Sequence, residues 1–131
     1  MTSSPAARGT AIVLVAHGSR SEPANDAHRS VADRLQQAAD APVVAAFLEL
    51  AEPSIPAAIA DVVDAGADLV LVLPHFLYPG RHLARDIPAL VAESADRHPG
   101  VRVEMLEAFG ADPGVLELLT EQIHRALDPH G

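Results

Sequence analysis

The sequence has no cysteine and no tryptophan, and its aromatic residues are one tyrosine and three phenylalanines. Without cysteine, the chain can form no disulfide, no thiolate metal site and no cysteine nucleophile. No apolar stretch approaches the roughly 20 residues that a membrane-spanning helix needs. The core must therefore be aliphatic, and any metal site must use ligands other than sulfur.

Basic residues are also scarce: 9 Lys and Arg stand against 18 Asp and Glu, for a formal net charge of −9. This charge argues against nucleic acid and anionic membranes as partners. An anionic ligand would need a local basic cluster, for which Arg20, Arg81 and Arg85 are the candidates. The apolar run at 11–16 is too short for a signal peptide, so we expect a cytoplasmic protein.

The length of 131 residues suits one domain, which we place at residues 10–131 after a disordered arm at 1–9. Four apolar segments have the pattern of strands: Thr10–Ala16, Val43–Leu48, Leu69–Leu73 and Val101–Leu106. A segment with helical spacing follows each strand, starting near Pro23, Pro53, Leu83 and Pro113.

Two of these helices carry more detailed expectations. The first should bury a face made of Ala27, Val31, Ala32 and Leu35. In the third, proline fits only a first turn or a kink, so Asp86 is expected to cap the main segment that contains Pro88.

The alternation of strands and helices predicts an α/β fold: a four-stranded parallel sheet flanked by helices, with right-handed crossovers. The first and third strands are the most evenly apolar and should be central, which gives the strand order 2-1-3-4. The second strand is apolar for an edge, and cover by a partner subunit would explain this.

Two histidines follow the two central strands. His17 ends the first strand, and His82 comes shortly after the third. Ligands of open α/β sheets bind at the carboxyl ends of the strands, where the strand order reverses. Together with Glu49, at the end of the second strand, these residues predict a site for Co²⁺, Ni²⁺, Fe²⁺ or Zn²⁺. The plainer interpretation is a loop histidine that is bonded to backbone.

Other histidines and polar residues leave alternatives open. His75 directly follows the third strand and competes for the metal, unless its side chain points away from the crevice. Ser19 either binds a ligand or caps the following turn, and the three arginines either bind carboxylates or form a solvated rim. The remaining histidines are expected at the surface: His28, His98, His124 and His130.

Several other chemistries lack their motifs. The chain has no phosphate-binding Gly-Lys-Ser/Thr loop, no Gly-x-Gly-x-x-Gly after the first strand and no Gly-x-Ser-x-Gly elbow. A histidine phosphatase would need arginine before its His-Gly pair, and this chain has Ala16 there.

Three motifs together resemble the CbiX-type sirohydrochlorin chelatases. They are His17-Gly18-Ser19-Arg20, Phe47-Leu48-Glu49 with Pro53-Ser54-Ile55, and the run Pro74-x-Phe76-Leu77-x-x-Gly80-x-His82-x-x-x-Asp86-Ile87-Pro88. The resemblance covers residues 10–127 and implies a chelatase-like fold that inserts a divalent metal into sirohydrochlorin. It favours cobalt as the metal over iron or nickel without deciding among them, and it implies that no ATP or organic cofactor takes part.

The resemblance also implies roles for individual residues. His17 and His82 would bind the metal, Glu49 would act with them in catalysis, and no role transfers to His75. Ser19 and the three arginines would bind the carboxylates of the tetrapyrrole. The single-domain length resembles the short form of the family, which is expected to pair as a homodimer. The alternatives are a metal or tetrapyrrole carrier that does not turn over, and a half-domain that needs a separate partner chain.

Overall fold

The structure is a computed structural model that describes residues 9–78 and 80–128, with the backbone alone for His82 and Leu83. Most of the expected N-terminal arm, residues 1–8, lies outside the described part. The elements in chain order are β1 (Thr10–Ala16), α1 (Glu22–Ala38), β2 (Val43–Phe47), α2 (Ile55–Asp64), β3 (Leu69–Pro74), α3 (Arg81–Arg97), β4 (Arg102–Met105), η1 (Phe109–Ala111) and α4 (Pro113–Leu127).

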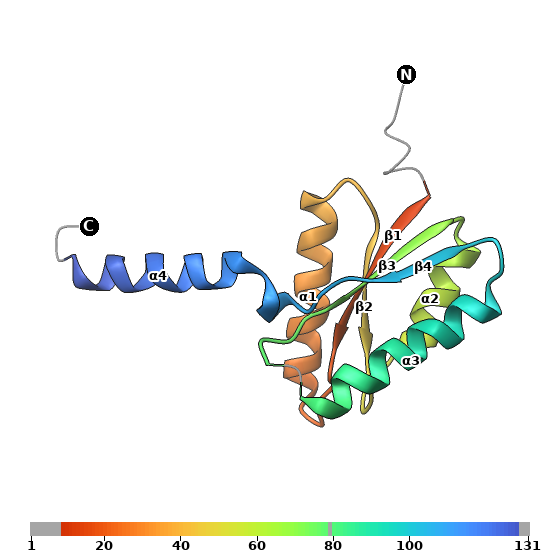
Figure 1. Cartoon of the computed structure of the whole chain (residues 1–131), viewed down its shortest axis with the longest axis horizontal. Coiled ribbons are helices and arrows are strands. Elements are labelled where there is room, and N and C mark those ends of the chain that lie inside the picture. Colours follow the sequence, from red (N-terminus) through yellow and green to blue (C-terminus); the bar gives the residue numbers. More distant parts are fainter. Residues whose placement is uncertain (1–8, 79, 129–131) are drawn as a thin grey trace, which may run out of the picture.

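The four strands form one parallel sheet in the order β2-β1-β3-β4, as the sequence predicts. β1 and β3 are central. β1 is mostly buried on both faces, whereas β3 alternates between buried and partly buried residues. The carboxyl ends of β1 and β2 and the first turn of α3 come together at the lower end of the molecule in Figure 1. The sheet therefore gathers the candidate residues at one edge.

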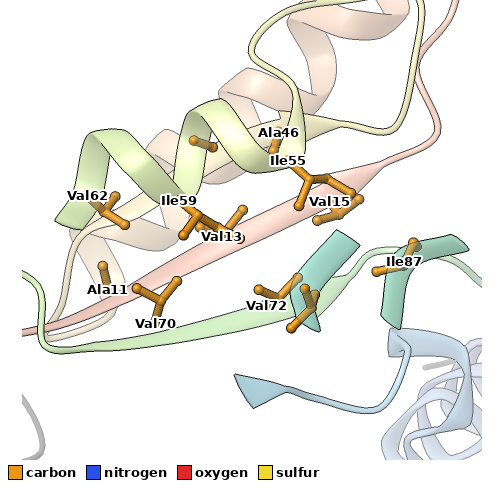
Figure 2. Packing of buried hydrophobic residues seen from close by; sticks show 12 residues of the cluster. Ala11, Val13, Val15, Ala46, Ile55, Ile59, Val62, Val70, Val72 and Ile87 are labelled. Carbon is orange, nitrogen blue, oxygen red and sulfur yellow. The ribbon is translucent and has the colours of Figure 1, made fainter. Parts of the chain in front are cut away.

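Aliphatic side chains fill both faces of the sheet. On one face, α2 and α3 cover β1 and β3, and Figure 2 shows Val62, Ile59 and Ile55 of α2 beside Ala11, Val13 and Val15 of β1, respectively. On the other face, a smaller cluster joins α1 to β1 and β2. Both faces of the β2 edge strand are thus covered within the chain, so its apolar character does not require a partner subunit.

The buried face of α1 differs from the predicted one. Ala27 and Leu35 are exposed, and the buried residues of α1 are Asn25, His28 and Ala32. Both polar side chains hydrogen-bond to backbone of the β1 region, which offsets the cost of burying them. Hydrophobic spacing cannot detect a helix face that is buried through polar residues.

α3 begins earlier than predicted. The Ala84 N–H donates to the carbonyl of Gly80 at 3.0 Å, and the helix runs from Arg81 through Pro88 without a break. Asp86 is therefore an exposed residue inside the helix, not its cap. Pro88 is also exposed, so water can satisfy the carbonyl that loses a backbone partner there.

α4 projects from the domain as an arm (Figure 1). Its cap is the predicted one, with the Asp112 side chain accepting from the Gly114 N–H at 2.7 Å. Its main contact within the described chain is η1, and none of its residues is buried. No helix of the described residues is long and apolar enough to cross a membrane.

Candidate metal site

Backbone pairing between β1 and β2 brings His17 and Glu49 together. The register pairs Ala16 with Phe47 at the ends of the two strands. Beyond the strands, the Leu48 N–H donates to the carbonyl of Ala16 at 2.9 Å, and the Glu49 N–H donates to that of His17 at 3.0 Å. The two loops therefore leave the sheet side by side.

The two side chains meet at the end of this ladder. His17 Nε2 lies 2.7 Å from Glu49 Oε2, and the side chains are 53% and 57% exposed. An ionised carboxylate only accepts, so Nε2–H is the donor in this contact. An exposed pair of this kind contributes about 0–1 kcal/mol to stability. Because the pair is exposed and contributes little to stability, we interpret it as a binding site and not as a structural contact.

Gly18 allows the two loops to come this close. It has φ of +100°, and a Cβ at this position would lie 1.7 Å from the carbonyl oxygen of Glu49. On the opposite loop, Leu50 adopts φ of +67° and is 57% exposed. Strained backbone at an exposed leucine is more typical of a functional site than of a structural turn.

A groove of about 400 Å³ lies beside this pair, lined by Leu48, Glu49, Asp86, Ala89 and Leu90. It joins the end of β2 to the first half of α3. The backbone of His82 is one helical turn before Asp86. The side chain of His82 is outside the described residues, so its predicted role as a ligand stays a prediction. Within the described part, no three His, Asp or Glu residues form a group that could hold a metal ion.

The predicted substrate-binding residues lie around the same edge. The Ser19 hydroxyl accepts from the Ser21 N–H at 3.0 Å, as the capping alternative predicts. Arg20, Arg81 and Arg85 are exposed and form no ion pair with any described residue. Arg81 and Arg85 are four residues apart on α3 and therefore neighbours on its surface.

His75 and His28 form a separate pair. Their rings stack at a centroid distance of 5.6 Å, and the rings of His75 and Phe109 form a T-shaped contact at 5.5 Å. His28 is 7% exposed and its Nε2–H donates to the carbonyl of Leu14 at 2.9 Å. The expectation of a surface position for His28 is therefore wrong. No described interaction joins His75 to Glu49.

A surface position was also predicted for His98 and His124, which both lie in the described part of the chain. His124 is exposed on α4, and His98 is partly exposed at the end of α3. His130 lies outside the described residues.

Comparison with known proteins decides which family has this arrangement. The model of the CbiX family matches residues 11–126. The chain belongs to the CbiX family.

Relatives and solved structures agree with this assignment. The chain is 35% identical over 117 residues to the chloroplastic sirohydrochlorin ferrochelatase of Arabidopsis thaliana, covering 88% of this chain and 52% of that protein. It is 30% identical over 131 aligned positions to the sirohydrochlorin cobaltochelatase of Methanothermobacter thermautotrophicus, covering 88% and 92%. A CbiX protein structure from Marinobacter aquaeolei superposes with a TM-score of 0.78 at 28% identity, covering 90% and 97%.

A further structure was solved with a metal bound. The sirohydrochlorin chelatase of Bacillus subtilis subspecies spizizenii, in complex with cobalt, has a TM-score of 0.76 at 31% identity, covering 88% of this CbiX chain and 50% of that one. This chain thus spans about half of some relatives and nearly all of others.

The contact between the two loops predicts unequal effects of two alanine substitutions. Gly66 also has positive φ, at +113°, but a Cβ there would meet nothing within 4 Å. Gly66→Ala should therefore cost only backbone strain, about 1–2 kcal/mol in the free energy of unfolding. Gly18→Ala should cost at least about 2 kcal/mol more, because Glu49 must also move. Urea unfolding of both variants measures the difference. Equal losses in the free energy of unfolding would contradict a close contact between residue 18 and the carbonyl of Glu49.

Burial of His28 predicts a pH-dependent stability of this CbiX domain. Desolvation lowers the pKa of His28 below 6.5, opposed by its hydrogen bond to Leu14 and assisted by the neighbouring His75. The unfolded chain then binds a proton more readily than the folded one, so the stability is complete above pH 6.5 and falls as the pH drops through the folded pKa. Urea unfolding between pH 8 and 5 should show a shallower decline for His28→Gln than for wild type. A His124→Gln control should keep the wild-type slope, and an unchanged slope in His28→Gln would contradict the assignment.

Proposed function

We propose that this chain inserts a divalent metal ion into sirohydrochlorin, with Co²⁺ as the preferred substrate and Fe²⁺ or Ni²⁺ as alternatives. The observation that carries the proposal is the His17–Glu49 pair at the carboxyl edge of the sheet, in a member of the CbiX family. Relatives named as cobaltochelatases and as ferrochelatases support the reaction class and leave the metal open.

The chemistry of the pair fits the two tasks of insertion. A cation can bind His17 Nε2 only after the proton has left that nitrogen, for water or for Nδ1, so metal binding replaces the hydrogen bond to Glu49. Metal entry also displaces two N–H protons from the tetrapyrrole, and the exposed Glu49 carboxylate would accept them one at a time, passing the first to water before it takes the second. A site with few protein ligands keeps positions open, and this allows the ion to pass on to the macrocycle. We propose His82 as the second metal ligand.

The proposed substrate matches the surroundings of the pair. Sirohydrochlorin carries several carboxylates. Arg20, Arg81 and Arg85, which form no ion pair with a described residue, would bind them together with Ser19. The exposed Leu50 and the groove along α3 offer apolar contact to the ring. We propose that the reaction uses no ATP and no organic cofactor.

Multiple-turnover insertion tests the proposal. With excess sirohydrochlorin and Co²⁺ under anaerobic conditions, the product measured by absorbance should exceed one equivalent per chain. His17→Ala and His82→Ala should lose at least about 100-fold in rate, since each removes a proposed ligand. His75→Ala should retain most of the activity, because His75 packs against His28 and Phe109.

Two results would contradict this assignment. Product that stops at one equivalent would favour the carrier. Equal losses in His75→Ala and His82→Ala, with the fold intact by circular dichroism, would move the metal to His75.

We also propose that the chain is a homodimer in which α4 packs on the partner. α4 exposes an apolar stripe in which the largest exposures are those of Leu116 (70%), Ile123 (57%) and Leu127 (74%). On the α1 side of the sheet, no described helix packs extensively over β3 and β4, and Leu69, Leu71 and Leu73 are only partly buried there. Two unpartnered apolar faces in one chain are complementary in a symmetric pair.

The junction before α4 favours a second copy over a helix that folds back. Asp112 is the only residue between η1 and α4, and its N–H donates to the carbonyl of Phe109 at 3.1 Å. Its side chain also caps α4, and Pro113 has a fixed φ. Folding back would break these contacts, whereas exchange between two copies keeps them.

Light scattering after gel filtration tests the dimer. Wild type should have twice the chain mass of 13.7 kDa. Ile123→Glu should be monomeric, because it places a charge in the proposed apolar contact. Glu117→Gln, a polar exposed position on the same helix, should remain dimeric. A monomeric wild-type chain would contradict the exchange and leave the half-domain alternative.

A further inference from the structure

Asn25 is the most deeply buried polar residue of α1, at 2% exposure. Its side chain binds one residue of the β1–α1 loop twice. The Ser19 N–H donates to Oδ1 at 2.9 Å, and Nδ2 donates to the carbonyl of Ser19 at 2.8 Å. The amide therefore replaces a strand partner for Ser19, and both of its polar ends are satisfied.

These two hydrogen bonds hold the middle of the β1–α1 loop, where few other contacts restrain the backbone. His17 is tied to β2 through its carbonyl, but Gly18, which follows, has no side chain to restrict its backbone. At the other end, Ser21 precedes α1 and makes no side-chain cap. Asn25 thus holds the loop at Ser19, two residues beyond His17. Gly18 lies between His17, which is bonded to the backbone of Glu49, and Ser19, which is bonded to Asn25.

One turn further along α1, Arg29 holds the opposite loop. Its Nη2 donates to the carbonyl of Glu52 at 2.9 Å, and its guanidinium lies 5.0 Å from the centre of the Phe47 ring. Residues 25 and 29 lie on the same face of the helix. One helix face therefore contacts the loop that carries His17 and the loop that carries Glu49.

We propose that Asn25 is a positioning residue for metal insertion. It never touches the metal or the tetrapyrrole. By holding the backbone of Ser19, it keeps His17 Nε2 within reach of Glu49 and of the incoming ion. The inference rests on the proposed function and adds to it a residue outside the three motifs of the resemblance.

Steady-state insertion by Asn25→Ala tests this role. We expect kcat to fall by about 10- to 100-fold, since a displacement near 1 Å can cost that much. The KM for sirohydrochlorin should rise by a smaller factor than kcat falls, because Arg81 and Arg85 on α3 stay in place and only Ser19 and Arg20 share the loosened loop. The matched control is Val62→Ala, which creates a cavity in α2 at 6% exposure, far from the loops. It should lower the melting temperature without lowering kcat.

Asn25→Asp provides a readout that a purely structural role would not move. A protonated carboxyl group has one acceptor and one O–H donor, so it can restore both bonds to Ser19, whereas a carboxylate cannot donate. The ratio of kcat for Asn25→Asp to wild type should therefore rise as the pH falls, while the ratio for Asn25→Ala stays flat. The pH dependence of the Asn25→Asp ratio alone is measured on folded protein, and it remains a test if Asn25→Ala fails to fold.

Three results would overturn the inference: wild-type kcat in Asn25→Ala, an equal loss of kcat in Val62→Ala, or a pH-independent ratio for Asn25→Asp. Failure of the proposed function has a different signature, since wild type itself would then show no turnover. In that case, the role of Asn25 is tested by measuring the affinity of the site at His17 for Co²⁺ in wild type and in Asn25→Ala. Asn25→Ala should weaken it about tenfold relative to wild type, and an unchanged affinity would reject the role.

Discussion

The site depends on the parallel pairing of β1 with β2, which continues for two hydrogen bonds beyond the strands. This continuation holds the backbone of His17 beside that of Glu49 before either side chain contributes. The hydrogen bond between the two side chains is exposed and contributes little to stability, so it follows from the geometry of the loops and does not create it. Gly18 is then required, because any side chain there would separate the loops.

α1 adds further hydrogen bonds to the two loops and to β1. Its inner face carries Asn25, His28 and Arg29, which bind the β1–α1 loop, the β1 strand and the β2–α2 loop respectively. Polar contacts of this kind are directional, and aliphatic packing is not. The polar groups of α1 therefore make directional contacts to both loops that carry the candidate site residues.

The sequence predicts most of the architecture. Apolar runs and their alternation with helices are sufficient for the strand order and for the edge at which His17 and Glu49 meet. The polar face of α1 could not be predicted, because burial of Asn25 and His28 depends on backbone partners that only the fold supplies. The predicted start of α3 was wrong because proline was expected only in a first turn or at a kink. Pro88 is exposed, so water can bind the carbonyl that lacks a backbone donor and the helix continues through it. The apolar stripe of α4 predicts a helix, but the stripe alone does not say which surface it covers.

A crystal structure of the chain soaked with Co²⁺ tests the central claim, that the interlocked loops present His17 and Glu49 to a metal ion. The account predicts cobalt bound to His17 Nε2 at about 2.1 Å, the usual length of a metal–imidazole bond, with the loop backbone unchanged. Cobalt bound at His75, or binding at His17 only after the β1–α1 loop has moved away from Glu49, would contradict it.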